Sequence, residues 1–277
     1  MSSSAKWTIL RYTGLSLFAI PWIIVPIWLV LVNSFKTSGE AAIPTLALPM
    51  TWNIVENYLT VWTKGAYPRA LLNNILVALP VIAAVVLAGS AAAWAFGRSK
   101  SGTMQVGYYV ISMTILISPA LIPTILLLQQ LQLNGSMIGY ILVMIGTRLG
   151  VVVFLATGFI RTLPTDLEDA ALIDGASAFQ TYYMIVLPLL APILFTGSII
   201  LVISVWSDFF FASFLLQGRA SETLSLSLYS FAATTAYSVN WSLVFTHVTM
   251  VSLPTFIAYA FMQKRILGGL TDGAIKG

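Results

Sequence analysis

The chain has no cysteine and only one histidine among its 277 residues. Without cysteine there can be no disulfide framework, thiolate metal site or cysteine nucleophile, and a lone histidine excludes a multi-histidine metal site. Charged residues are also scarce, at 8% of the chain, whereas a soluble domain carries about 25%. So few charges cannot cover a water-facing surface, and this deficit is explained if lipid surrounds most of the chain.

Hydrophobic residues, by contrast, make up 58% of the chain and gather in long runs. A transmembrane helix needs about 20 mostly apolar residues, and six runs meet that requirement. The runs are continuous rather than alternating, which disfavours the strands of a membrane barrel. We therefore predict an all-α integral membrane protein, a single domain over residues 1–277 with six transmembrane helices. The predicted spans are residues 12–32, 71–96, 106–128, 137–160, 189–211 and 243–262.

The basic residues predict how these spans are oriented. The formal charge is +4, but the basic residues are scattered between apolar runs, so there is no patch for nucleic acid. The positive-inside rule places both termini in the cytoplasm. The first run lacks a small-residue cleavage site and is long for a signal peptide, so we expect a retained anchor. Inside segments then hold Lys6, Arg11, Arg98, Lys100, Arg161, Lys264, Arg265 and Lys276, and outside segments hold Lys36, Lys64, Arg69 and Arg219.

The predicted cytoplasmic loop between the fourth and fifth spans, residues 161–188, is too well patterned for a plain connector. Thr165 has a glutamate three residues later, and Ser177 has a glutamine three residues later, so each begins a capping box. Gly175 stands between them and can adopt the left-handed conformation that ends a helix. The loop therefore predicts two short helices joined by a sharp glycine turn and leading into the fifth span.

The first of these short helices has an acidic polar face. Asp166, Glu168 and Asp169 lie in its first turn, and the small residues Ala170 and Ala171 follow. A helix that lies on lipid headgroups usually carries lysine and arginine on its polar face, whereas anionic lipid would repel these acids. The pattern therefore favours a protein partner, which the two alanines would allow to approach the backbone closely.

This loop resembles the EAA loop of ABC importer permeases. The family pattern is E-A-A, three residues, G, nine residues, I, one residue, and L-P. Here those positions are Asp169-Ala170-Ala171, Gly175, Ile185 and Leu187-Pro188. Asp169 replaces the usual glutamate and keeps its charge. Further stretches similar to permeases of the maltose-transporter type are residues 33–36, 91–98, 206–208 and 269–277.

The resemblance covers nearly the whole chain and implies the second, six-helix permease subunit of a carbohydrate importer in the cell membrane. It implies a second permease beside this one, two ATPase subunits that bind ATP and magnesium, and an extracytoplasmic binding protein. The cargo would be an oligosaccharide, a disaccharide or a polyol. The loop would be the coupling helix that docks in a cleft of an ATPase subunit. Residues in or beside that contact would be Asp166, Glu168, Asp169, Ala170, Ala171 and Gly175.

The chain lacks the machinery to hydrolyse ATP itself. A phosphate-binding loop needs G-x-x-x-x-G-K-[ST], and no glycine in this sequence is followed by lysine. We therefore predict no catalytic residue, no metal site and no cofactor in this chain, with ATP and magnesium bound by the partner ATPase.

A few polar residues within the spans are candidates for the substrate pathway. Arg148 lies in the fourth span, where an ionisable residue is a functional candidate, although structural pairing is the alternative. A GxxxG pattern surrounds Arg148 and favours close helix packing. Asp208 is near the outer end of the fifth span, where it could pair with Arg148 or accept a sugar hydroxyl, and Trp206 could stack on a sugar ring. We expect His247 in the sixth span to be buried and hydrogen-bonded rather than a proton relay.

Two other classes of protein are weighed against the importer. A carrier driven by an ion gradient would explain Arg148, Asp208 and His247 but not the capped acidic loop. A membrane-embedded enzyme would need a catalytic set that one histidine and few intramembrane acids do not provide. The long outside segments 33–70 and 212–242 carry aromatic residues, which suit either a membrane-interface belt or a docking surface for an external partner.

Overall fold

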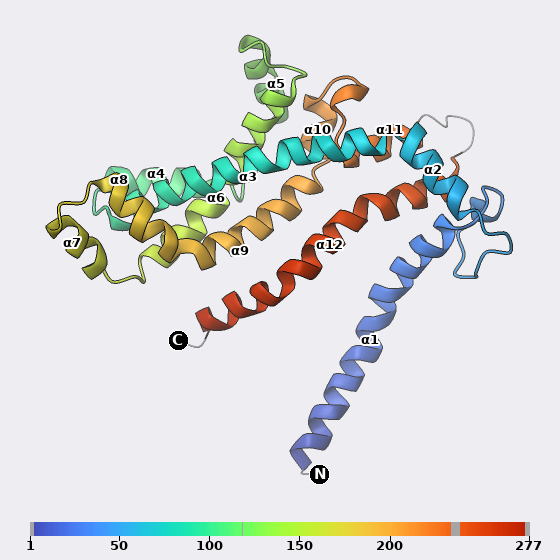
Figure 1. Ribbon diagram of the computed structural model, residues 1–277, viewed down its shortest axis with the longest axis horizontal. Coiled ribbons are helices and arrows are strands. Elements are labelled where there is room, and N and C mark those ends of the chain that lie inside the picture. Colours follow the sequence, from blue (N-terminus) through green and yellow to red (C-terminus); the bar gives the residue numbers. More distant parts are fainter. Residues whose placement is uncertain (1–2, 118, 234–238, 275–277) are drawn as a thin grey trace. The chain divides into compact units, whose positions relative to one another are not determined.

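The structure is a computed structural model that describes residues 3–117, 119–233 and 239–274, with side chains described except at 3–6, 8–10 and 261–274. Lys276 and the end of the predicted C-terminal pattern lie outside the described residues. Helices dominate the described chain, and none of its named elements is a strand (Figure 1). The long helices are α1 (Ser3–Ser34), α3 (Tyr67–Arg98), α6 (Met137–Ile160), α9 (Leu187–Trp206) and α12 (Trp241–Ala274).

Short helices connect the long ones. Two of them, η1 and η3, are 3-10 turns, and η2 is a π-helical turn. The short elements are η1 (Glu40–Ala42), α2 (Ile54–Lys64), α4 (Gly102–Met113), α5 (Leu121–Gln130), α7 (Asp166–Ile173), α8 (Ala178–Thr181), η2 (Tyr182–Val186), α10 (Phe210–Leu215), η3 (Arg219–Ser221) and α11 (Leu224–Ala233).

Five of the six predicted spans correspond to helices that are long and apolar enough to cross a membrane. The fourth predicted span coincides with α6, and the fifth begins earlier than predicted because α8, η2 and α9 run on without a break. It also ends earlier, at Trp206, because a separate helix α10 follows. Within the described residues these five segments are Arg11–Ser34, Tyr67–Arg98, Met137–Ile160, Ala178–Trp206 and Trp241–Ala260.

The third predicted span, residues 106–128, is not one helix. The chain there forms α4 and α5, of 12 and 10 residues, with a break between them. Pro119 lies in the break, where it lacks the N–H that a continuing helix would need. Each piece is shorter than the roughly 20 residues of a spanning helix, so a sixth crossing stays a prediction.

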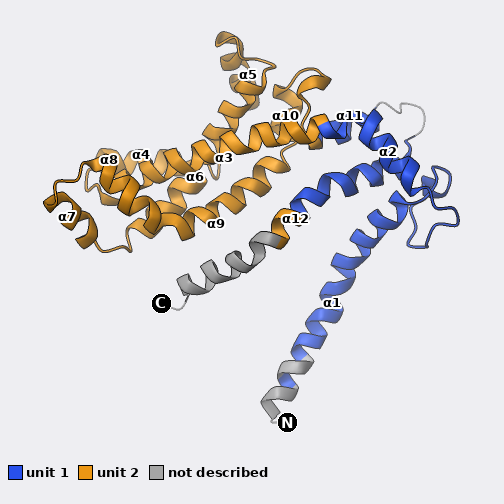
Figure 2. Cartoon of the chain, viewed as in Figure 1, with its two compact units in different colours: residues 1–68, 225–256 blue, residues 69–224, 257–277 orange. Residues whose placement is uncertain are grey.

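The chain divides into two compact units, residues 1–68 with 225–256 and residues 69–224 with 257–277 (Figure 2). In the first unit the chain after α1 folds back on itself, because the N–H of Asn53 donates to the carbonyl of Phe35 at 2.8 Å. Lys36 is only 3% exposed. Its ammonium donates to Asn33 Oδ1 at 3.0 Å, to Thr45 Oγ1 at 2.8 Å and to the Thr45 carbonyl at 3.1 Å. These bonds hold the loop between α1 and α2 in one conformation.

His247 is also in the first unit and is completely buried, as predicted. The expected hydrogen bond is wrong, because neither ring nitrogen has a partner among the described residues. The reason is its surroundings: the imidazole meets the rings of Tyr67 and Phe231 edge-on, with centroids 6.4 and 5.5 Å away. The Tyr67 hydroxyl donates to the carbonyl of Met250 instead.

In the second unit small residues bring helices into close contact. A β-carbon at Gly97 of α3 would lie 2.6 Å from Ile160 Cγ2 of α6. A β-carbon at Gly150 of α6 would lie 2.6 Å from the carbonyl oxygen of Ile111 in α4, whereas Gly146 faces open space. The close packing expected from the GxxxG pattern is therefore found at its second glycine only.

Candidate functional site

The loop between α6 and α9 contains the two predicted short helices, α7 and α8, on either side of a glycine turn (Figure 1). Gly175 has φ +79°, the predicted left-handed conformation. It ends α7 through bonds from Gly175 N to the Leu172 carbonyl and from Ala176 N to the Ala171 carbonyl, at 3.1 and 2.9 Å. The turn fixes the angle at which α7 leaves the rest of the loop.

Of the two predicted capping boxes, the second is confirmed and the first is wrong. The Ser177 hydroxyl accepts from the N–H of Gln180, and the Gln180 side chain accepts from the N–H of Ser177 at 2.8 Å. The Thr165 side chain makes no capping bond, and its backbone is helical. The Glu168 N–H donates instead to the Thr165 backbone carbonyl at 2.8 Å, and the Glu168 side chain, which would complete the box, is engaged by another helix.

Glu168 is bound by the end of α3. Arg98 donates to Glu168 Oε1 through Nη2 at 2.6 Å and through Nε at 3.0 Å. Trp94 Nε1 donates to Glu168 Oε2 at 2.9 Å, and Arg98 Nη1 also donates to the Leu163 carbonyl at 3.1 Å. The first turn of α7 is therefore fastened to α3, and the Glu168 carboxylate points into the chain's own structure.

The rest of α7 presents an acidic and apolar face to the outside. Asp166, Asp169 and Ala170 are exposed, but Ala171 is buried against the chain's own interior. Ile173 is 87% exposed at the end of the helix. A partner would thus meet carboxylates, one small residue and a projecting isoleucine. Sequence reasoning had assigned both alanines to this surface.

A second polar group joins α6 to the chain just after α9. Asp208 Oδ2 accepts from the Tyr140 hydroxyl at 2.8 Å and from the N–H of Ala212 at 3.1 Å. Arg148 Nη2 lies 3.8 Å from Asp208 Oδ1, so the predicted pair is present. Sequence reasoning missed Tyr140, which is completely buried, because a tyrosine within an apolar run gives no local sign of its partner.

Two donors in this region lack partners. Arg148 Nε and Trp206 Nε1 are buried and make no hydrogen bond among the described residues. A buried donor without a partner costs about 1–3 kcal/mol, so an unpaired donor favours a ligand oxygen. Beside Arg148, the Asp208 carboxylate supplies an acceptor, so this pair offers the donor and acceptor chemistry that hydroxyl groups require.

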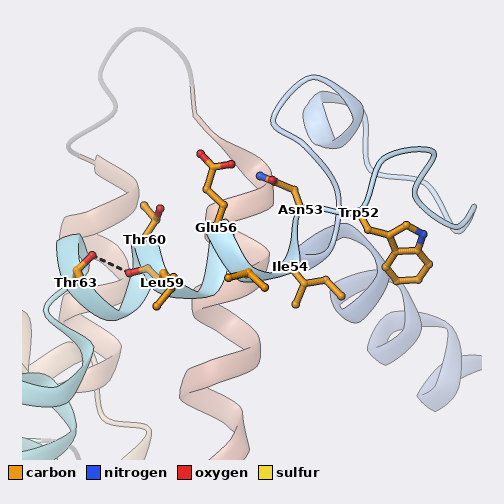
Figure 3. A pocket seen from close by; sticks show the side chains of 8 residues that line it. Trp52, Asn53, Ile54, Glu56, Leu59, Thr60 and Thr63 are labelled. Atoms are coloured by element: carbon orange, nitrogen blue, oxygen red, sulfur yellow. Dashed lines mark hydrogen bonds between the residues drawn. The ribbon is translucent and has the colours of Figure 1, made fainter.

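A shallow groove of about 650 Å³ runs along α2, in the segment predicted to lie outside the membrane. The side chains of Glu56 and Thr60 point to one side of the helix, and those of Ile54 and Leu59 point to the other (Figure 3). The groove combines polar and apolar walls but holds no cluster of charges.

Comparison with known proteins gives consistent matches. The profile of a family described as "Binding-protein-dependent transport system inner membrane component" matches residues 84–266. The probable starch degradation products transport system permease protein of Thermoanaerobacterium thermosulfurigenes is 30% identical over 97% of this chain and 96% of its own. The diacetylchitobiose uptake system permease protein of Streptomyces coelicolor is 27% identical over 99% of this chain and 91% of its own.

A solved structure shares the fold. It is the crystal structure of a bacterial ABC transporter involved in the import of the acidic polysaccharide alginate. The matching chain is 21% identical, the match covers 95% of this chain and 98% of that chain, and the TM-score is 0.80. At this identity the likeness establishes the fold alone.

Proposed function

Since the chain belongs to the family of binding-protein-dependent transport system inner membrane components and is a multi-pass protein of the cell membrane, we propose that it forms half of a translocation pathway for a carbohydrate. In this proposal a second permease completes the pathway. A dimer of ATPase subunits binds ATP and magnesium on the cytoplasmic side, and an extracytoplasmic binding protein delivers the substrate.

The observation that carries the coupling part of the proposal is the exposed face of α7. Asp166 and Asp169 supply negative charge at a helix N-terminus, and Ile173 supplies an apolar projection, 87% exposed. Leu167, Leu172 and Ile173 are all exposed on this short helix, and an exposed apolar patch rimmed by polar residues marks a protein contact. We assign α7 as the coupling helix, with Asp166, Asp169, Ala170 and Gly175 in or beside its contact with the ATPase.

The carbohydrate assignment is supported by the relatives and by the buried polar group. The similar permeases are named for diacetylchitobiose and for starch degradation products, and both cargoes are rich in hydroxyl groups. Arg148 Nε and Trp206 Nε1 have no hydrogen-bond partner in the described part of the chain, and Asp208 can accept. Because one arginine faces one aspartate there, the group carries no excess positive charge, which favours an uncharged sugar or polyol.

The proposal is tested by measuring the ATPase activity of the full complex in lipid nanodiscs, with the binding protein and a panel of sugars. We expect one sugar with its binding protein to stimulate hydrolysis. Asp169→Lys and Gly175→Pro should abolish the stimulation, since one reverses the charge of the contact and the other cannot adopt the turn. Thr162→Lys introduces the same side chain at an exposed position before α7 and serves as the control.

Two results would contradict this proposal. If both α7 variants assemble and keep full stimulation, α7 is not the coupling element. If no ATPase subunit co-purifies with the chain, the proposed partnership with an ATPase dimer fails.

A further inference from the structure

One side chain on α3 contacts the cytoplasmic loop on both sides of its glycine turn. Trp94 donates from Nε1 to Glu168 Oε2 of α7 at 2.9 Å. The same indole stacks on the ring of Tyr182 in η2, with centroids 5.9 Å apart and planes at 27°. Because α7 and η2 lie on opposite sides of the glycine turn, Trp94 fixes the two parts of the loop against a single point on a long helix.

The bond to α7 is a strong one. Both oxygens of Glu168 are occupied, Oε1 by Arg98 and Oε2 by Trp94, and the carboxylate side chain is 13% exposed. Charge-assisted hydrogen bonds of this kind are short and about twice as strong as neutral ones. Removing one partner of such a partly buried pair leaves a charge without compensation. Helix α7 therefore cannot rotate about its own axis without breaking this group.

The contact with η2 braces an irregular turn of the backbone. A π-helical turn is rare, occurs mostly as a single turn within an α-helix, and is frequent at functional sites. Tyr182 is the first residue of this turn. Its hydroxyl lies 2.8 Å from Ser90 Oγ and donates to the Leu87 carbonyl at 3.2 Å, so it is anchored on α3 within two turns of Trp94.

The geometry points to Trp94 as a positioning residue that keeps the coupling helix α7 and the joint η2 in fixed register on α3. A displacement of α7 by its partner then moves α3 and, through η2, also moves α9. Without this attachment, bending at the glycine turn would let α7 move alone. Glu168 acts in this account as the point of attachment and not as a contact for the ATPase. The inference rests on the proposed coupling function of α7.

The test compares stimulated ATPase activity per assembled complex in nanodiscs for Trp94→Phe and Glu168→Gln. Phenylalanine keeps an aromatic ring for Tyr182 but removes the Nε1 donor, and glutamine keeps the shape but removes the charge. Coupling between sites typically amounts to a 5- to 150-fold effect, so we expect stimulation to fall about fivefold or more while the ATPase subunits still co-purify. Trp22→Phe, at a tryptophan that is 73% exposed on α1, should leave the stimulation unchanged.

A charge-swapped double variant, Arg98→Glu with Glu168→Arg, separates positioning from mere loss of folding. We expect each single change to reduce stimulation and the pair to restore assembly but not full stimulation, because an arginine at position 168 cannot accept the hydrogen bond of Trp94 Nε1. Assembly with reduced stimulation in the double variant supports the inference, and full stimulation would overturn it, because the Trp94 bond would then be dispensable. Full stimulation in both Trp94→Phe and Glu168→Gln would also overturn it.

The same experiment distinguishes this inference from the proposed function. If Asp169→Lys abolishes stimulation while Trp94→Phe and Glu168→Gln do not, α7 couples to the ATPase without the bracing, and only the inference fails. If Asp169→Lys is also fully stimulated, the coupling function itself fails.

Discussion

Lys36 is a buried cation whose hydrogen bonds, among the described residues, go to uncharged oxygens. An ammonium has three protons to donate, and Asn33 Oδ1, Thr45 Oγ1 and the Thr45 carbonyl accept them. Burying a charge is costly unless it is hydrogen-bonded, so this site tolerates lysine only while the loop after α1 keeps its shape. The charge and the loop conformation therefore depend on each other.

The two glycines around Arg148 give a prediction at the scale of single residues. Gly150→Ala would place a β-carbon against the Ile111 carbonyl and Thr114 Oγ1, whereas Gly146→Ala meets open space. Overpacking of this kind costs about 1–3 kcal/mol, and an alanine in an open helical position gains up to about 1 kcal/mol over glycine. Unfolding in mild detergent should show Gly150→Ala less stable than the native chain and Gly146→Ala equal or more stable. Equal loss of stability in both would mean that α4 does not approach α6 at Gly150.

Single residues also show where a local sequence pattern no longer predicts the structure. Ser177 was predicted to cap a helix and does so, because its partner Gln180 lies three residues away. Thr165 has the same local pattern but makes no box. Its own backbone is helical, and the Glu168 side chain that would complete the box is bound by Arg98 and Trp94, about 70 residues earlier. Nothing near Glu168 in the sequence indicates that competition.

At the scale of secondary-structure elements, the two capping positions give a second prediction. Ser177→Ala removes an N-cap bond and should destabilise the start of α8 by about 1 kcal/mol. Thr165→Ala removes a side chain that makes no capping bond, so the start of α7 should change little. Hydrogen exchange of the loop, followed by mass spectrometry, should show faster exchange after Ser177→Ala only. Equal acceleration in Thr165→Ala would show that Thr165 caps α7 in the membrane-bound protein.

Element boundaries were predictable where apolar runs are bounded by polar residues. Helix α6 begins after the capping Ser136, whose hydroxyl accepts from Gly139 N, and it ends before Arg161, as predicted. The third run misled because its composition is as apolar as the others, while Pro119 interrupts the backbone. Hydropathy measures the solvent that side chains prefer and is insensitive to a missing N–H.

At the scale of the whole molecule, the orientation in the membrane is the prediction to check. The chain has no cysteine, so a single introduced cysteine is the only thiol. Met50→Cys, at a side chain 94% exposed after α1, should react with an impermeant maleimide added outside intact cells. Ser101→Cys, exposed between α3 and α4, should react only after the membrane is opened. The unmodified chain serves as the control, and the opposite pattern would reverse the predicted orientation.

The family match establishes the class of this molecule, and the likeness to a solved structure establishes its fold. The candidate contacts differ in how far the sequence predicts them. The exposed acids Asp166 and Asp169 followed from local pattern. The pair of Arg148 and Asp208 could be guessed because ionisable residues in lipid seek partners. The roles of Tyr140 and Trp94 depend on helices far apart in the sequence, and only the folded chain brings those partners together.

The π-helical turn at Tyr182–Val186 has a consequence for changes in chain length. A π turn takes up about one residue more than an α-helical turn. Deleting one residue there would therefore let the segment rewind as an α-helix while the flanking residues stay on their present faces. The same deletion within the regular helix α9 would instead turn everything before it by about 100°, swing Glu168 away from α3 and aim the acidic face of α7 in a new direction. The π turn is thus a joint at which a change of one residue in chain length leaves the direction of α7 unchanged.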